Sequence, residues 1–280
     1  MEELTRKIFT GERALFCAKD LLLAESVFDD GESPLKESEN IQASSCLFRW
    51  KYPFWYAKNI TVKDCTFFEN ARAGIWYTED ISLTNCTYLA PKGLRRCKNI
   101  SLSGVTFSDA KETLWNCRDI SMKDVTVKGD YFAMNCEDVQ IDHLELIGNY
   151  GFDGAKNVVI RNSKLLTKDA FWNCENITVY DSFISGEYFA WNSKNVTLVN
   201  CMVESLQGFC YMKNVTLKNC KLVNTTLSFE YAENVDAEIF GKIDSVKNPT
   251  SGKIVCDGVD ELILDEFAAK DACAQVERRK

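Results

Sequence analysis

The sequence is poor in histidine, lacks a basic excess and contains no long apolar run. His143 is the only histidine, and 33 Lys and Arg residues stand against 41 Asp and Glu residues, a formal net charge of -8. Because phosphate backbones attract basic surfaces, we expect no nucleic-acid partner. No stretch approaches the roughly 20 apolar residues of a membrane helix. The first residues also lack a basic segment followed by an apolar one. We therefore expect a cytoplasmic protein that does not contact a membrane.

Several short motifs that would indicate a metal or cofactor are also missing. No C-x-x-C pair occurs, so a zinc site is not expected. The glycine-rich nonapeptide that binds calcium, the phosphate-binding loop and the Gly-x-Ser-x-Gly elbow are absent as well. The sequence accordingly predicts no metal and no cofactor.

A recurring Asn or Asp followed by Ile, Val or Leu is the strongest positive signal. It returns every 19 to 21 residues, at Asp20, Asn40, Asn59, Asp80, Asn99, Asp119, Asp138, Asn157, Asn176, Asn195, Asn214 and Asn234. Self-similarity at a short fixed period predicts a solenoid, in which each repeat buries its apolar face against its neighbours. Asn and Asp suit such a corner because both tolerate left-handed backbone.

Each repeat shows the alternation of short strands. In residues 59–67, Ile60 and Val62 alternate with polar residues, Asp64 interrupts the run, and Cys65 and Phe67 resume it. A third apolar stretch precedes the ladder position. These patterns predict an all-β, single-stranded right-handed parallel β-helix of about 12 coils, with three short strands per coil. A leucine-rich repeat is the alternative, but the other half of each repeat lacks leucines at helical spacing.

We expect one domain over residues 1–280, because no linker interrupts the repeat. Residues 4–9 are expected to cover the first coil. The segment of about 241–280 is expected to form a loop and cap, with a last strand at 262–264 and a short polar helix over 265–280. Terminal coils need such covers because they expose strand edges.

The 13 cysteines follow the repeat instead of a disulfide framework. One set lies six residues after the ladder position and another lies two residues before it, both where other repeats carry small apolar or Ser residues. Cysteine is therefore predicted to fill the core as a small apolar residue. His143 lies at the bend five residues after the ladder position, so we interpret it as a turn residue.

The repeats, together with the segments GEYFAWNS, SFEYAENV and SVKNPTSG, resemble a bacterial family known as domain of unknown function 3737. The resemblance covers nearly the whole chain. It implies the pectate-lyase-like β-helix fold, and it implies no particular activity.

One outward column is rich in aromatic residues. The position four residues before the ladder carries Trp55, Trp76, Arg95, Trp115, Trp172 and Trp191, and a neighbouring column carries Tyr131 and Tyr188. Arg95 interrupts the row of tryptophans, as do Met134 and Asp153. Exposed aromatic patches often mark binding surfaces, and indole faces stack on sugar rings. We expect these eight residues to bind a saccharide. The alternative is an external aromatic ladder covered by a loop or by another subunit.

Acidic residues near the same face are the candidates for catalysis. Asp153, Asp169 and Glu187 lie in adjacent coils, and a glycosidase needs two carboxyl groups about 5 to 9.5 Å apart. A lyase would instead use a cationic base beside calcium, for which Arg95, Arg96, Lys51 and Arg72 are the nearest candidates. The sequence leaves two functions open. One is carbohydrate binding or carbohydrate chemistry, and the other is a non-enzymatic assembly protein that forms a homo-oligomer.

Overall fold

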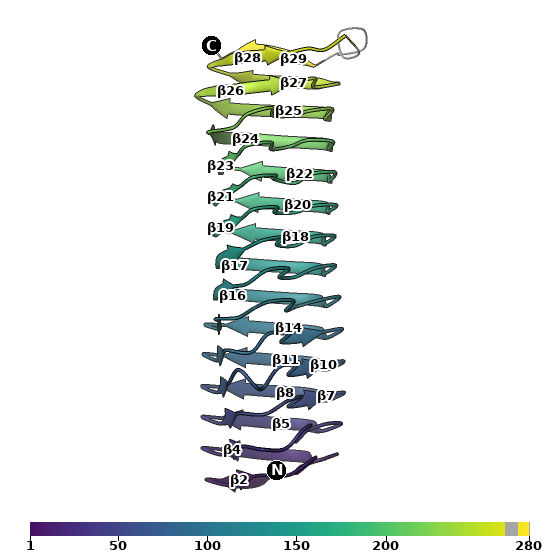
Figure 1. Ribbon diagram of the computed structural model, residues 1–280, viewed down its shortest axis with the longest axis vertical. Helices are drawn as coiled ribbons and strands as arrows, with labels where there is room; N and C mark the ends of the chain where they lie inside the picture. The colour runs from purple at the N-terminus through teal and green to yellow at the C-terminus, as the bar shows by residue number, and fades with distance from the viewer. Residues whose placement is uncertain (267–273, 280) are drawn as a thin grey trace. The chain divides into compact units, whose positions relative to one another are not determined.

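The computed structural model describes residues 1–266 and 274–279. The chain divides into two compact units, unit 1 over residues 1–144 and unit 2 over residues 145–280. Figure 1 shows the strands of each unit as successive rungs, and every pairing between them is parallel. Over the described residues the chain forms an all-β parallel solenoid of about 14 turns. The predicted fold is confirmed, and the predicted number of coils is slightly too small.

In unit 1, a longer and a shorter strand form two faces of most coils. The longer strands are β1 (Glu2–Thr5), β3 (Lys19–Ala24), β5 (Glu39–Ser44), β8 (Lys58–Lys63), β11 (Glu79–Thr84) and β14 (Lys98–Ser103). The shorter strands are β2 (Ile8–Phe9), β4 (Val27–Phe28), β6 (Leu47–Phe48), β9 (Thr66–Phe67), β12 (Thr87–Tyr88) and β15 (Thr106–Phe107). The two merge in β16 (Arg118–Lys128) and β17 (Glu137–Gly148). A third face is a strand only in β7 (Phe54–Trp55), β10 (Ile75–Trp76) and β13 (Leu94–Arg95).

Unit 2 repeats this plan. Its longer strands are β18 (Lys156–Arg161), β20 (Glu175–Tyr180), β22 (Lys194–Val199), β24 (Lys213–Val223), β25 (Glu233–Phe240), β27 (Gly252–Cys256) and β29 (Gln275–Arg278). The shorter ones are β19 (Lys164–Thr167), β21 (Phe183–Gly186) and β23 (Met202–Ser205), and β26 (Lys242–Lys247) pairs with β28 (Gly258–Ile263). The third face is mostly a turn, and several of its residues, such as Phe171, Ala190 and Phe209, adopt positive φ angles.

The apolar side chains of alternating strand positions stack like on like inside each unit. In unit 1, Phe28, Phe48 and Phe67 form a column with ring centroids 4.9 and 4.6 Å apart. In unit 2, Phe209 and Phe229, which belong to the turns of the third face, stack at 5.0 Å. All of these rings are buried. Aromatic pairs contribute about 0.5 to 1.5 kcal/mol beyond burial, so each added coil gains from repeating its neighbour's residue.

The recurring Asn and Asp residues form the corners. All twelve have φ between 53° and 59°, the left-handed region that Asn and Asp enter most easily. Their side chains also bond from coil to coil. In unit 1 the Asn59 amide donates to Asn40 Oδ1 at 2.8 Å, and in unit 2 the Asn214 amide donates to Asn195 Oδ1 at 2.7 Å. The ladder therefore relieves backbone strain and binds neighbouring coils at once.

The ends of the chain differ from the expectations. Residues 2–9 form β1 and β2, which pair in register with β3 and β4, so they build the first coil and do not cap it. The expected strand at 262–264 lies largely within β28. The helix expected over 265–280 is wrong for residues 275–278, which form β29 against β27. Residues 267–273 of that expected helix lie outside the described residues.

The predictions for cysteine and histidine are confirmed. Twelve cysteines fall within the described residues; all are free thiols, and each except Cys17 is buried. Burial raises the pKa of thiols such as Cys201 and Cys220. His143 lies within β17 with a φ of 57°, the left-handed backbone of a corner, and its Nδ1 lies 3.1 Å from Asp142 Oδ1. The cysteines therefore fill the core, and the histidine occupies an exposed corner of the coil.

Candidate functional site

The aromatic column of unit 1 is a closed stack, which we call the unit 1 ladder: Trp55, Trp76, Arg95 and Trp115. The Trp55 and Trp76 indoles are nearly parallel, at 6°, with ring centroids 5.2 Å apart. The Arg95 guanidinium then lies 5.0 Å from the Trp76 ring centroid and 4.3 Å from that of Trp115. Each face between these residues is covered by a neighbour. Arg95 therefore continues the column that the sequence suggested it interrupts.

An ion pair fixes Arg95 in this position. Its guanidinium bonds the Glu112 carboxylate, which also receives Lys92 Nζ at 3.2 Å. Burial pushes the pKa of Glu112 upward, but the hydrogen bonds from Lys92 and Arg95 outweigh burial and hold this pKa below its usual value. Glu112 is therefore a firmly ionised partner that orients the guanidinium plane.

The indole N–H groups are mostly used within the chain. In unit 1, three of them donate to backbone carbonyls of the following coil: Trp55 to Ala73 at 2.6 Å, Trp76 to Lys92 at 2.9 Å and Trp115 to Tyr131 at 2.6 Å. In unit 2, Trp172 donates to the Tyr188 carbonyl at 3.1 Å. Among the residues that the structure describes, the indole N–H of Trp191 has no hydrogen-bond partner. Trp191 thus differs from the other four tryptophans of the column.

The aromatic residues of unit 2 are arranged more openly. We define the unit 2 patch as Tyr188, Trp191 and Trp172. The Tyr188 ring is perpendicular to the Trp191 ring, at 88° with centroids 5.7 Å apart, and the two indoles are tilted by 35° at 6.1 Å. All three side chains are half-buried. Because the rings are tilted or perpendicular, they cover each other less completely than the parallel indoles of unit 1 do.

A charged network borders the unit 2 patch. Lys168 Nζ lies 3.2 Å from Glu187 Oε2, and the Tyr188 hydroxyl also bonds the Glu187 carboxylate. The Tyr188 hydrogen bond, followed by that of Lys168, holds the pKa of Glu187 below its usual value. Burial raises the pKa of Asp169, opposed by Lys168 and assisted by the charge of Glu187. Two neighbouring carboxyl groups therefore have pKa values shifted in opposite directions.

A shallow groove opens beside this network, and we call it the unit 2 groove. Its volume is about 260 Å³, and its lining residues are Ser185, Gly186, Glu187, Glu204, Leu206 and Asn224. Glu204 accepts hydrogen bonds from Ser185 Oγ at 2.9 Å and Asn224 Nδ2 at 2.8 Å. The bond from Asn224, then that from Ser185, lowers the pKa of Glu204. Leu206 is 53% exposed, so apolar surface and ionised oxygen acceptors lie side by side.

The three expected catalytic carboxylates do not share this groove. Glu187 lines it, whereas Asp169 is only 2% exposed and its Oδ1 is buried without a hydrogen-bond partner. Asp153 lies at a corner, where its Oδ1 accepts a hydrogen bond from Asn173 at 3.2 Å. The structure thus brings Asp169 and Glu187 into electrostatic contact and gives Asp153 a structural bond.

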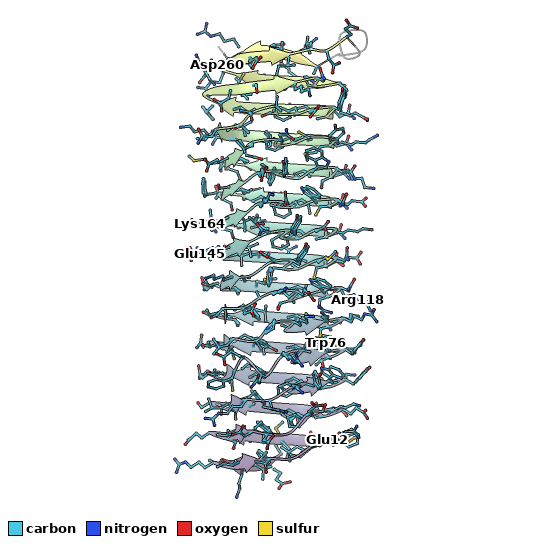
Figure 2. The ribbon with its side chains drawn as sticks, viewed as in Figure 1. Glu12, Trp76, Arg118, Glu145, Lys164 and Asp260 are labelled. Carbon is cyan, nitrogen blue, oxygen red and sulfur yellow. The ribbon has the colours of Figure 1, made fainter. Side chains whose placement is uncertain are left out.

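Two further features of the described residues bear on the site. No group of three or more His, Cys, Asp or Glu side chains among them could hold a metal ion. Among the same residues, no helix is long and apolar enough to span a membrane. Figure 2 shows Trp76 and Arg118 on the same side of unit 1 in this view.

These features define the class of protein: a parallel β-solenoid whose corners carry aromatic and charged columns. The chain belongs to the family described as protein of unknown function DUF3737, whose model matches residues 2–277. None of the curated proteins compared with the chain matches it.

Two solved structures show a distant similarity to the chain. The chain is similar to PfbA, a surface adhesin of Streptococcus pneumoniae, at 6% identity and a TM-score of 0.45, covering 88% of this chain and 82% of that one. It is also similar to the A-module of the mannuronan C-5 epimerase AlgE4 of Azotobacter vinelandii, at 9% identity and a TM-score of 0.34, covering 99% and 88%. With TM-scores this low, neither similarity carries an argument about ligands.

Proposed function

We propose that this protein binds a carbohydrate, and that the sugar occupies the unit 2 patch and the adjoining unit 2 groove. The observation that carries the proposal is the meeting of aromatic rings with ionised carboxylates around Glu187. A sugar presents hydroxyl donors around its rim and C–H groups on its faces. The carboxylates of Glu187 and Glu204 are acceptors for the hydroxyls, and Tyr188 and Leu206 offer apolar surface.

The free indole N–H of Trp191 adds a donor to this arrangement. A buried or half-buried N–H usually finds a partner, and four tryptophans of the column obey that rule. Trp191 lies beside Tyr188 and leaves its donor for a ligand oxygen. The unit 1 ladder lacks this opportunity, because Arg95 and the parallel indoles cover one another. The proposal therefore assigns the saccharide to unit 2 and a structural role to Trp55, Trp76 and Trp115.

The test compares Trp191→Phe with Trp76→Phe. Phenylalanine keeps an aromatic ring and removes the indole N–H in both cases. Intrinsic fluorescence titrations with a panel of neutral oligosaccharides should show binding by the wild type. Loss of a ligand hydrogen bond in Trp191→Phe should weaken binding by about fivefold to tenfold. Trp76→Phe should lower the melting temperature, because it breaks the bond to the Lys92 carbonyl, and leave binding unchanged. Absence of a response to every saccharide would remove the proposal.

Binding without hydrolysis is the form of the function that we propose. Asp169 and Glu187 have oppositely shifted pKa values, as acid and base pairs often do. However, Asp169 Oδ1 is shielded from solvent, and a general acid must reach the glycosidic oxygen. Incubation with the bound oligosaccharide should therefore release no shorter product. If the wild type released a shorter product and both Asp169→Asn and Glu187→Gln did not, the protein would be a glycosidase instead.

Self-association is a second candidate function, favoured by apolar side chains exposed on unit 2. Leu206 is 53% exposed, Tyr211 is 41% exposed and Met202 is 40% exposed. Such residues also suit a contact between copies of the chain. Sedimentation of the wild type and of Leu206→Ser separates the two candidates. A dimer that Leu206→Ser dissociates, with no saccharide response from the wild type, favours assembly.

A further inference from the structure

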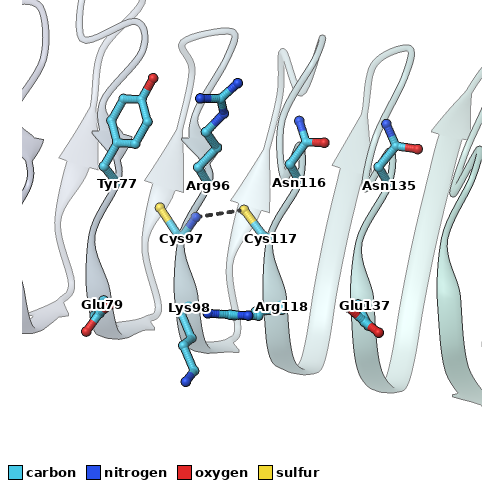
Figure 3. Close-up of a pocket in the computed structure, with 10 residues that line it drawn as sticks. All are labelled: Tyr77, Glu79, Arg96, Cys97, Lys98, Asn116, Cys117, Arg118, Asn135 and Glu137. Carbon is cyan, nitrogen blue, oxygen red and sulfur yellow. Dashed lines mark hydrogen bonds between the residues drawn. The ribbon is translucent and has the colours of Figure 1, made fainter.

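A second groove lies on unit 1, and its lining residues differ in kind from those of the unit 2 patch. We call it the unit 1 groove. Its volume is about 480 Å³, and Figure 3 shows two rows of side chains along it, with Tyr77, Arg96, Asn116 and Asn135 in one row and Glu79, Lys98, Arg118 and Glu137 in the other. The rows come from successive coils, because the members of the second row begin β11, β14, β16 and β17 and those of the first row lie two residues earlier. The groove therefore crosses four coils.

The charges in the second row differ from most of the others in this column because they form no ion pairs with other described residues, whereas Lys194 and Lys213, which also face each other in register, each bond a glutamate. At this position, one residue before the Asn or Asp ladder, opposite charges usually alternate and pair. Lys19 bonds Glu39 at 3.1 Å and Lys194 bonds Glu175 at 3.1 Å. In the unit 1 groove, Lys98 and Arg118 are direct register partners on β14 and β16. Two like charges opposed in register repel each other, so the pair lowers stability unless something else compensates it.

Glu79 on β11 is the register partner of Lys98 on β14, but no close ion pair offsets the repulsion in the described part of the chain. Within residues 1–266 and 274–279, Lys98, Arg118 and the nearby Arg96 make no ion pair. Glu79 and Glu137 lie at the two ends of the row, but neither carboxylate comes within 4.0 Å of a cationic nitrogen there. Arg96 only approaches the Tyr77 ring, at 5.7 Å from its centroid. Three cations without an ion pair thus line the groove in a chain of net charge -8, Lys98 and Arg118 in one row and Arg96 in the other (Figure 3).

The amides of the first row are also unused. In unit 2 the same column is satisfied internally, since the Asn192 amide donates to Asn173 Oδ1 at 2.9 Å and the Asn173 amide donates to Asp153. In unit 1, the side chains of Asn116 and Asn135 have no hydrogen-bond partner among the residues that the structure describes. Asn116 and Asn135 share a row with Arg96, across the groove from Lys98 and Arg118 (Figure 3). The groove therefore presents cationic and neutral donors together.

We infer that the unit 1 groove binds a small anion that also carries hydroxyl groups, such as a sugar acid or a sugar phosphate. Lys98 and Arg118 pair with the oxyanion, since guanidinium groups bind carboxylate and phosphate in a bidentate manner, and Arg96 donates to a further oxygen from the other row. Asn116 and Asn135 donate to further oxygens. Glu79 and Glu137, at the two ends of the row, accept hydrogen bonds from the hydroxyl groups of the ligand. At physiological salt, charges beyond about 8 Å are screened, so the overall negative charge does not prevent this local attraction. This inference concerns a different unit from the proposed saccharide site and stands without it.

Calorimetric titration of the full chain tests the inference with three probes. Glucuronate supplies a carboxylate, glucose 6-phosphate supplies a phosphate, and glucose supplies neither. One or both anions should bind, more weakly at high salt, while glucose should not bind to the groove. Binding of only one anion identifies which oxyanion the groove accepts. If neither anion binds to the wild type, the inference is wrong.

A matched pair of variants assigns the site. Arg118→Gln should weaken anion binding by about tenfold or more, because it removes a charge-assisted hydrogen bond. Its melting temperature should stay the same or rise, since no ion pair is lost and a like-charge contact is relieved. The control is the double variant Lys194→Gln, Lys213→Gln, which removes another register pair of lysines, each bonded to a glutamate. It should leave the affinity unchanged to about twofold. An equal loss of affinity in the control would show nonspecific attraction and overturn the assignment.

Discussion

The two units follow one repeat, yet their outer columns differ. Unit 1 closes its aromatic column by stacking Arg95 between two indoles, and it leaves the neighbouring charges and amides unpaired. Unit 2 pairs the corresponding amides of Asn173 and Asn192 and leaves the Trp191 donor free. Each unit thus satisfies one column within the chain and exposes another. The comparison indicates that a repeat protein can form a site where its side chains lack hydrogen-bond or ion-pair partners within the chain. This occurs in different columns in the two units.

The largest expected effect concerns the glycine of the unit 2 groove, which has no counterpart in the lining of the unit 1 groove. A Cβ on Gly186 would lie 2.0 Å from the carbonyl oxygen of Thr167, so the backbone must move. Gly186→Ala should lower the free energy of unfolding by about 3 kcal/mol and abolish the saccharide response. Gly258→Ala is the control, because its Cβ would meet nothing closer than 3.6 Å. Chemical denaturation measures both, and equal stabilities would contradict the close approach.

The next effect tests whether Arg95 holds the unit 1 ladder together. Arg95→Ala removes two guanidinium–indole contacts and the partner of Glu112, so unfolding should become easier by about 2 kcal/mol. The control, Arg161→Ala in unit 2, removes one guanidinium that lies 4.2 Å from the Tyr180 ring centroid. It should cost about 0.5 kcal/mol. If thermal unfolding showed the same loss of stability for both variants, the position of Arg95 between Trp76 and Trp115 would add nothing to stability.

A smaller effect compares the amide column of the two units. Asn173 and Asn116 both have a φ of 54°, which glycine adopts freely. Asn173→Gly loses one donated and one accepted hydrogen bond and should cost about 1 kcal/mol more than Asn116→Gly, which loses none within the described chain. Denaturant midpoints of the two variants measure the difference. A reversed order would show that the unit 1 amides are bonded in solution.

The smallest effect is confined to a pH window. Because the pKa of Asp169 is raised, the folded chain holds its proton after the unfolded chain has released it. Stability should therefore fall as pH rises from the usual pKa of aspartate to the raised one, and Asp169→Asn should remove this fall. Glu187 should behave oppositely, since its lowered pKa gives stability that is lost as pH falls through that pKa. Thermal melts across acidic pH check both signs, and parallel profiles for wild type and Asp169→Asn would refute the assignment.

The repeat itself made most of the fold predictable. Counting from the ladder position located the corners, the buried cysteines and the bend at His143, because each depends only on strand alternation. The site was less accessible. Arg95 was interpreted as a break, since its charge hides the fact that a planar guanidinium stacks like a ring. The free N–H of Trp191 depends on where the carbonyls of the next coil point, which no spacing reveals.

One signal was present in the sequence and was missed. The column before the ladder contains Lys98 and Arg118 in consecutive repeats, flanked by Glu79 and Glu137. Inspecting charge alternation along that column would have indicated the unit 1 groove. The same inspection would not have separated it from Lys194 and Lys213, because only coordinates show that those lysines are paired.

The hydrogen bonds between side chains of the Asn and Asp ladder all run in one direction along the chain. Each amide donates to the residue of the preceding coil, as Asn99 does to Asp80 at 2.7 Å and Asn234 to Asn214 at 3.0 Å. The carboxylate of an aspartate accepts such a hydrogen bond but cannot donate one. The row of hydrogen bonds therefore ends at Asp80 and does not continue to Asn59. In unit 2, the line from Asn234 to Asn157 runs without an aspartate. Deamidation of one asparagine would therefore interrupt this row, because the resulting carboxylate no longer donates a hydrogen bond to the preceding coil.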